Sequence, residues 1–326
     1  MLGIALVGAC LVGCNVVPTP LPAVQAADQR RVGLIVAPDD GTASILSAIR
    51  AARRRVLLEM YMLTAPDALQ ALRTAHDAGA DVRVLLEPAP YGDASANQAA
   101  FSILAAANID VRWTSRAAGL VHAKLLVLDG ALAYVMTMNF TGAGLGTNRE
   151  YAVVDRDPVD VQWAERIWNA DAVGADSGPG PGGARLLVSP LDARPRLSAC
   201  VDAAQVSILI EIEEFSDADL SARLVAARAR DVAVTVVAPA LNRSAGTTAV
   251  LGRLAAAGAA IRALAVPVVH AKAMIVDGGV AYVGSMNFTR ASLDDNREFG
   301  LLLTDAGAIA RIGAVIASDA AAGVAF

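Results

Sequence analysis

The sequence predicts an α/β protein made of two homologous halves, and three observations lead to this fold class. The segment from His122 to Glu150 closely resembles the segment from His270 to Glu298. Residues 33–63 similarly match residues 185–215 at an offset of 152. In both copies, short runs rich in Val, Ile and Leu alternate with Ala-rich stretches of helical character. Such a repeat predicts strands covered by helices, built twice.

The length and composition fit this division. The chain has 326 residues, enough for one large domain or for two of about 150 residues each. Hydrophobic residues make up 55% of the chain, so a substantial core can be buried. The formal net charge of −5 lacks the positive excess of proteins that coat nucleic acid. A local basic cleft can nevertheless coexist with an acidic total.

The N-terminal residues predict export and a membrane anchor. Residues 1–14 form an apolar run that is too short to span a bilayer but suits a signal peptide. The run ends in Leu-Val-Gly-Cys, which resembles a bacterial lipobox with Cys14 as the lipidated residue, and residues 15–31 then form a Pro-containing tether. We expect an extracytoplasmic protein of the bacterial cell envelope, anchored by lipid. The alternative is a secreted protein.

The two halves are expected at residues 32–173 and 184–326. Residues 174–183, GADSGPGPGG, separate them as a flexible Gly/Pro linker. Each half is predicted to run strand, helix, buried strand, helix, strand, helix. After the opening strand, these elements are expected at 44–54, 56–62, 68–78, 82–86 and 98–107 in the first half, and at 197–204, 206–212, 220–230, 232–237 and 248–257 in the second.

Each matched segment also predicts a β-hairpin. An Asp-Gly pair, a common hairpin turn, lies between strand-like runs at residues 129–130 and again at 277–278. A His and a Lys lie two residues apart on the incoming strand, so their side chains should share one face. An Asn follows the return strand. The hairpins therefore bring together His122, Lys124 and Asn139 in one half, and His270, Lys272 and Asn287 in the other.

The lysines point to chemistry at these hairpins. Of 27 basic residues, 25 are arginine, and the only two lysines lie two residues after matched histidines. Imidazoles can serve as nucleophile and as general acid or base, while ammonium, amide and hydroxyl groups can hold a tetrahedral anion. A protonated lysine is not a metal ligand, so neither a metal nor another cofactor is expected. This set suits in-line displacement at phosphorus.

A carboxylate follows each histidine at a distance of 28 residues and could fix the tautomer of the imidazole. These carboxylates complete the set of candidates. The candidate catalytic residues are His122, Lys124, Glu150, His270, Lys272 and Glu298. The candidate phosphate-binding residues are Lys124, Thr137, Asn139, Lys272, Ser285 and Asn287.

The run H-x-K-x4-D, then six residues, then G-[S/G]-x-N resembles the signature of the phospholipase D superfamily. The second copy fits throughout, with His270, Lys272, Asp277, Gly284, Ser285 and Asn287. The first copy fits with His122, Lys124, Asp129, Thr137 and Asn139, but Met136 stands where the family has Gly. A side chain at this position is expected to crowd the approach of the backbone to a phosphate.

The resemblance implies two phospholipase D-like α-β-α halves, each a mixed β-sheet flanked by helices, with one active site at their interface. It also implies metal-free hydrolysis of phosphodiesters through a phosphohistidine. By analogy His122 is the nucleophile and His270 the general acid, while Asp129 and Asp277 are structural. The expected protein is a monomer with a pseudo-twofold repeat.

Release of phospholipid headgroups is the leading expected activity, because a membrane anchor holds the enzyme where phospholipid is concentrated. The alternatives are an endonuclease acting on nucleic acid, a phosphatidyltransferase resembling cardiolipin synthase, and a catalytically impaired envelope lipoprotein that only binds its ligand. Glu59 and Glu211 either line the site or pair with arginine. Tyr61 and Glu213 are weaker candidates for lining it, and Cys200 is expected in the core.

Overall fold

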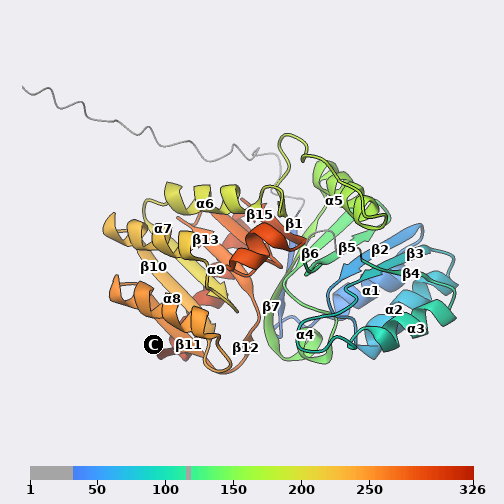
Figure 1. Ribbon diagram of the computed structural model, residues 1–326, viewed down its shortest axis with the longest axis horizontal. Coiled ribbons are helices and arrows are strands. Elements are labelled where there is room, and N and C mark those ends of the chain that lie inside the picture. The colour runs from blue at the N-terminus through green and yellow to red at the C-terminus, as the bar shows by residue number, and fades with distance from the viewer. Residues whose placement is uncertain (1–31, 115–118) are drawn as a thin grey trace, which may run out of the picture.

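The computed structural model describes residues 32–114 and 119–326, and Figure 1 shows two halves side by side. The predicted signal peptide, Cys14 and the tether lie outside these residues. The strands of the first half are β1 (Val32–Ala37), β2 (Arg55–Met60), β3 (Asp81–Leu86), β4 (Asp110–Trp113), β5 (Lys124–Leu128), β6 (Leu132–Met136) and β7 (Asn148–Asp155). Its helices are α1 (Ala43–Ala51), α2 (Pro66–Asp77), α3 (Gln98–Ala106), α4 (Gly142–Gly146) and α5 (Pro158–Asp171).

The second half repeats this order. Its strands are β8 (Leu186–Ser189), β9 (Ser207–Ile212), β10 (Ala233–Pro239), β11 (Ala260–Leu264), β12 (Val268–Val269), β13 (Lys272–Val276), β14 (Val280–Gly284), β15 (Glu298–Leu303) and β16 (Val324–Ala325). Its helices are α6 (Ala193–Ala203), α7 (Ala218–Ala229), α8 (Ala245–Ala256) and α9 (Ala306–Ala322), with a π-helical turn at Ala291–Asp295.

Both sheets are mixed and share one strand order. The first runs β1-β7-β6-β5-β2-β3-β4, and the second runs β8-β15-β14-β13-β9-β10-β11-β16. Strands β2 and β3, joined through α2, pair in parallel, as do β9 and β10, joined through α7, because each crossover helix returns the chain to the same end of the sheet. The hairpin strands β5 and β6, and likewise β13 and β14, pair antiparallel. The predicted α/β class and hairpins are confirmed.

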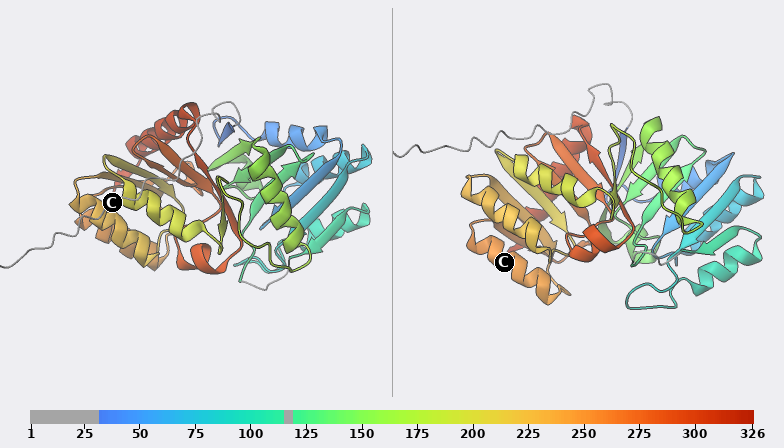
Figure 2. Two further views of the ribbon diagram at one scale, coloured as in Figure 1. Left: turned by 90° about the horizontal axis from the view of Figure 1, so that it is seen from above. Right: turned by 45° about the horizontal axis from the view of Figure 1, so that its top comes forward.

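The helices divide each half into layers. Helices α1 to α3 cover the outer face of the first sheet, and α6 to α8 cover that of the second (Figures 1 and 2). Side chains alternate along β2: Val56, Leu58 and Met60 face the outer helices, while Leu57 faces inward. The inner faces of both sheets share one apolar cluster with α5 and α9. The two halves therefore have a continuous core across their interface.

The interface also includes an exchanged strand. Strand β12, from the second half, pairs in parallel with β7 of the first sheet, and both lie at the seam in Figure 1. In the matching contact, Val121 of the first half forms a β-bridge with Arg297 of the second half. Backbone hydrogen bonds thus cross between the halves on both sides of the seam, so each half is held in register by the other.

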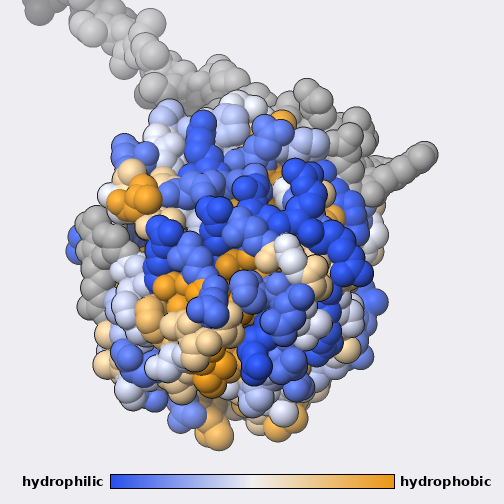
Figure 3. All heavy atoms as spheres, turned by 90° about the vertical axis from the view of Figure 1, so that its right-hand side faces the viewer, coloured by the Kyte–Doolittle hydropathy of each residue, from blue (hydrophilic) through white to orange (hydrophobic). Residues whose placement is uncertain are grey.

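The outer face of the first half is mainly hydrophilic, with apolar side chains in small groups (Figure 3). Cys200 is buried in the core of the second half, as predicted, and burial raises the pKa of its thiol to about 11. Within residues 32–114 and 119–326, no helix is both long and apolar enough to cross a bilayer.

Candidate active site

The hairpin turns are fixed by their aspartates. Asp129 and Asp277 both have a positive φ, of 56° and 51°, which Asp tolerates better than most residues. The Asp129 carboxylate accepts hydrogen bonds from three successive backbone amides, at residues 53–55. Asp277 accepts the equivalent bonds from residues 205–207. These contacts join each hairpin to the start of the neighbouring strand, which agrees with the structural role expected for both residues.

The structure differs from the prediction in where the histidines lie. Strands β5 and β13 begin at the lysines, so His122 and His270 lie just before the strands rather than on them. Both lysines are fully buried, and each curls back to donate to the carbonyl of its own histidine, at 2.8 Å for Lys124 and 2.6 Å for Lys272. Each ammonium group therefore lies next to its own histidine, and Lys272 Nζ is 3.2 Å from His270 Nδ1.

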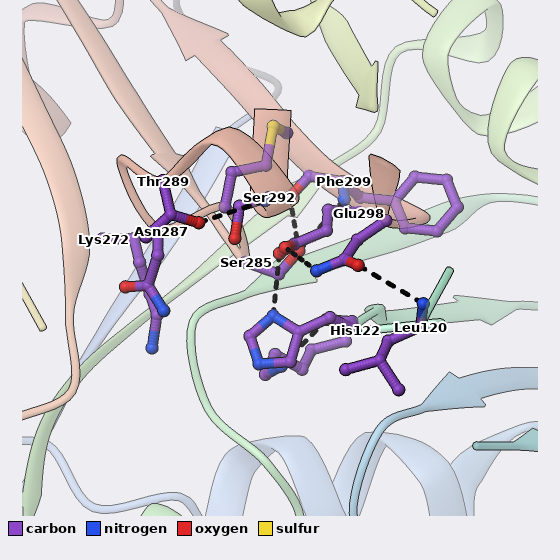
Figure 4. Close-up of polar contacts among 12 residues, drawn as sticks. Leu120, His122, Lys272, Ser285, Asn287, Thr289, Ser292, Glu298 and Phe299 are labelled. Atoms are coloured by element: carbon purple, nitrogen blue, oxygen red, sulfur yellow. Dashed lines mark hydrogen bonds and ion pairs between the residues drawn. The ribbon is translucent and has the colours of Figure 1, made fainter. Parts of the chain in front are cut away.

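Each histidine is bound by a glutamate of the other half. His122 Nδ1 lies 2.8 Å from Glu298 Oε2, and His270 Nδ1 lies 2.8 Å from Glu150 Oε1. Figure 4 shows Glu298 reaching His122 from the second half. Both carboxylates are fully buried. The glutamates are thus placed to orient the imidazoles, as expected, but each serves the histidine of the other copy rather than that of its own.

A second pair of crossed contacts lies next to the first, and the sequence alone did not reveal it. Arg297 Nε lies 2.9 Å from Asp171 Oδ2 in α5, and Arg149 Nε lies 2.6 Å from Asp319 Oδ2 in α9. The Arg297 carbonyl also accepts from the amide of His122. The signal in the sequence is the repeated Asn-Arg-Glu triplet, in which the arginine always precedes the orienting glutamate.

The histidines and asparagines of both halves meet at one cavity. Its volume is about 530 Å³, and its walls come from both halves. The predicted residues that line it are His122, Asn139, His270 and Asn287, with Tyr61, Tyr91, Glu213 and Glu214 beside them. Among the residues that the structure describes, no cluster of three or more His, Cys, Asp or Glu could hold a metal ion.

In the first half, Tyr61 packs against the histidine and the lysine of the site. Its ring lies edge-on to His122 with centroids 4.5 Å apart, and Lys124 Nζ lies 4.9 Å from its centroid. Burial lowers the pKa of His122 below its ordinary value, although Glu298 opposes the effect. Burial, together with the nearby ammonium of Lys272, lowers the pKa of Lys124 to about 7.

In the second half, Glu213 takes the place of Tyr61. Its carboxylate lies 2.6 Å from Lys272 Nζ and accepts from Asn287 Nδ2 at 3.3 Å. Burial would raise the pKa of Glu213, but the charges of His270 and Lys272 outweigh it and hold the pKa well below normal. Glu213 therefore has a larger part in the site than the weak lining role that the sequence predicts. The feature of the sequence that indicates it is a charged side chain on the same strand face as the buried Glu211.

The structure does not bring Thr137 and Ser285 to the cavity, contrary to the prediction that they bind phosphate. Both hydroxyls are fully buried. Thr137 donates to Glu150 at 2.5 Å, and Ser285 accepts from the amide of Phe299 at 3.1 Å. These hydroxyls satisfy buried polar groups of the strands beside the site, which leaves them no free route to a ligand.

The expectation that Met136 crowds a phosphate is wrong. Its side chain is fully buried in the outer core of the first half, away from the cavity. The matching Gly284 is required for packing instead, because a Cβ there would lie 2.5 Å from Gly300 Cα. The basis for expecting a catalytically impaired protein is therefore removed.

Glu59 and Glu211 lie beneath the site rather than in its wall. Tyr151 Oη donates to Glu211 Oε2 at 2.6 Å, and burial raises the pKa of Glu211 to about 8. Burial, with the nearby Asp171 carboxylate, raises the pKa of Glu59 well above its ordinary value. Glu59 lies close enough to Asp171, and Glu211 to Asp319, for these aspartates of the crossed pairs to influence their pKa values.

Comparison with known proteins decides the family. The family model described as "Cardiolipin synthase, PLD-like domain" matches residues 45–172 and 197–319, one span in each half. The chain belongs to the phospholipase D superfamily. Within this superfamily, it is 29% identical to mitochondrial cardiolipin hydrolase from Xenopus tropicalis over 134 residues. That match covers 40% of this chain and 62% of the relative, less than two thirds of its length.

Two solved structures of other proteins share the two-half architecture of this superfamily member. Phosphatidylserine synthase from Haemophilus influenzae superposes with a TM-score of 0.70 at 11% identity, over 91% of this chain and 88% of that one. Polyphosphate kinase from Porphyromonas gingivalis superposes with a TM-score of 0.68 at 14% identity, over 91% of this chain and 51% of that one. At these identities the likeness shows the fold alone.

Proposed function

We propose that this phospholipase D superfamily member cleaves phosphodiesters through a covalent phosphohistidine and releases headgroups from phospholipids. One observation supports this most strongly. His122 and His270 line a single cavity, and each has its Nδ1 bound to a buried carboxylate of the other half. This arrangement leaves the Nε2 atom of each ring as the reactive nitrogen.

In the first step, His122 Nε2 attacks phosphorus. The lowered pKa of His122 keeps its imidazole neutral near pH 7, so a lone pair is available. The N–P bond forms as the bond to the leaving oxygen breaks, and His270 donates a proton to that oxygen. Lys124 and Lys272 provide positive charge beneath the phosphate, and Asn139 and Asn287 offer amide donors at the cavity wall.

In the second step, His270 takes a proton from water, and the resulting oxygen attacks phosphorus. The N–P bond breaks and His122 is restored as the leaving group, while His270 has changed from general acid to general base between the steps. An acceptor alcohol in place of water would give transfer instead of hydrolysis. The same residues serve both outcomes.

Lipid is the favoured substrate for three reasons. The matching family model and the frog relative are both named for cardiolipin, itself a phosphodiester lipid. The expected anchor at Cys14 would hold the enzyme at a membrane of the cell envelope. The net charge of −5 gives no general attraction to nucleic acid.

The test is a parallel substrate panel. Purified protein in EDTA is incubated with vesicles of phosphatidylcholine, phosphatidylglycerol or cardiolipin, and separately with plasmid DNA, with the His122→Ala variant as control. We expect phosphatidic acid from at least one lipid and none with the variant. Nicked DNA alone would establish the endonuclease instead, and cardiolipin made from phosphatidylglycerol would establish the transferase. No product from any substrate would favour a binding lipoprotein.

The anchor is tested separately. We expect radiolabelled palmitate to be incorporated into the full chain in a bacterial host, and the protein to sediment with membranes. The Cys14→Ser variant should lose both properties. Retention of the label after this substitution would contradict the lipobox.

A further inference from the structure

Glu213 places one carboxylate oxygen among the ligand-binding groups of the second half. Its Oε2 lies 2.6 Å from Lys272 Nζ, 3.3 Å from Asn287 Nδ2 and 3.5 Å from His270 Nε2. The last of these is the reactive nitrogen, because Nδ1 of the same ring is held by Glu150. A single oxygen thus contacts the cation, the amide and the imidazole that would surround an oxygen of a phosphate.

The same groups are open in the first half. Lys124 Nζ donates to the His122 carbonyl and lies by the Tyr61 ring, and no carboxylate of the described residues forms an ion pair with it. Asn139 lines the cavity, and its Nδ2, the donor that matches Asn287 Nδ2, donates to no group within the described part of the chain. One half of the site is therefore available to an anion, while the other already contains one.

The difference comes from the side chain and not from the backbone. The amide of Glu213 donates to the Ala271 carbonyl at 3.0 Å, and the amide of Tyr61 donates to the Ala123 carbonyl at 2.9 Å. The Glu213 side chain keeps 32% of its surface exposed and lines the cavity. A carboxylate in this position can rotate into the cavity without any movement of the sheet.

We propose that Glu213 is an internal anion that fills the second-half phosphate subsite of the empty enzyme. The incoming phosphate enters against Lys124 and Asn139, then displaces the carboxylate from Lys272 and Asn287. This inference rests on the proposed function, because it concerns the same phosphate site. Because every phosphate must displace the Glu213 carboxylate, this residue weakens the binding of all of them. It thereby favours release of the product and selects against weak ligands.

Competition, rather than pH, removes the carboxylate. The charges of His270 and Lys272 hold the pKa of Glu213 low despite its burial, so Glu213 stays ionised at neutral pH. Glu150 and Glu214 also face this region. Both are acidic, so neither supplies a positive charge that would draw the Glu213 carboxylate away from Lys272.

The test measures binding of dimethyl phosphate by isothermal titration calorimetry in EDTA at one neutral pH. We expect Glu213→Gln to bind it at least tenfold more tightly than wild type. Glu213→Tyr, which copies the first half, should also bind more tightly. Glu214→Gln is the matched control, since it removes the same charge from the same cavity without touching Lys272, and we expect less than a threefold change. Circular dichroism melts confirm that each variant is folded.

Two results would overturn the inference. Unchanged or weaker binding by Glu213→Gln would mean that the carboxylate only positions Lys272. Equal tightening by Glu214→Gln would mean that the effect is general electrostatics. Cleavage of bis(p-nitrophenyl) phosphate by the same proteins separates this inference from the proposed function, and we expect Glu213→Gln to lower KM more than it changes kcat. Cleavage without tightening contradicts the internal anion alone, whereas tightening without cleavage contradicts the proposed function alone.

Discussion

The two halves of the site share a backbone and differ in the residue that faces the lysine. Tyr61 places an aromatic ring near Lys124, and Glu213 places a carboxylate against Lys272. Burial without an ion pair depresses the pKa of Lys124, to about 7. The comparison shows how one substitution between duplicated sequences can make two equivalent histidines unequal. His122 lies in the desolvated, open half, which suits a nucleophile, and His270 lies between two carboxylates, which suits a proton donor.

The largest effect is expected when the histidines themselves, one in each half, are replaced. We expect His122→Ala and His270→Ala to lower kcat by about 10⁴-fold or more, since both act in bond making or breaking. With bis(p-nitrophenyl) phosphate, whose leaving group needs little protonation, His270→Ala should still release a burst of p-nitrophenol. His122→Ala should give no burst in stopped-flow absorbance.

The third histidine, His76 in α2, provides the matched control for these variants. His76→Ala should cleave at the wild-type rate. Mass spectrometry of the quenched His270→Ala protein should find phosphate on His122. Recovery of the phosphate on His270 in wild type would reverse the assigned roles.

The orienting glutamates should give the next effect. We expect Glu298→Gln and Glu150→Gln to lower kcat by roughly 10–100-fold, because an amide no longer favours the required tautomer and charge of the ring. Glu298→Gln should slow the burst, because its partner is His122, whereas Glu150→Gln should slow the steady state that follows. If instead Glu150→Gln slowed the burst, the crossed pairing would be contradicted.

Lys124 should make the binding of anions depend on pH. Lys124 is charged below its pKa of about 7 and neutral above it, so its attraction for an anion is present at low pH and lost as pH rises. We expect the affinity for dimethyl phosphate, which does not titrate in this range, to fall by up to about tenfold per pH unit above 7. Calorimetry between pH 6.5 and 8.5 measures this, and Lys124→Met should flatten the profile. A slope that persists in this variant would assign the titration to another group.

The smallest expected effect lies where the halves are alike. Asp129→Ala and Asp277→Ala each leave three backbone amides without their acceptor. We expect each to lower the free energy of unfolding by about 1–3 kcal/mol, and by similar amounts, as measured in urea. A marked difference between the two would show that the halves also differ in their structural contacts.

The repeat accounts for how much could be predicted from the sequence. Local spacing placed His, Lys and Asn at each hairpin and identified the turn aspartates, because these features depend on contacts within one hairpin. It could not assign Glu298 to His122, since that contact depends on how two separate sheets pack. It also misjudged Thr137, Ser285 and Met136, because residue type alone does not show whether a side chain at a strand end faces the core or the cavity.

The crossed glutamates match the contacts that a twofold dimer of identical halves would form. In such a dimer, any mutation appears on both sides of the site at once. Joining the halves in one chain allows matched positions to evolve separately. Tyr61 and Glu213 are one such pair, and they could diverge because the two halves are encoded separately within one chain.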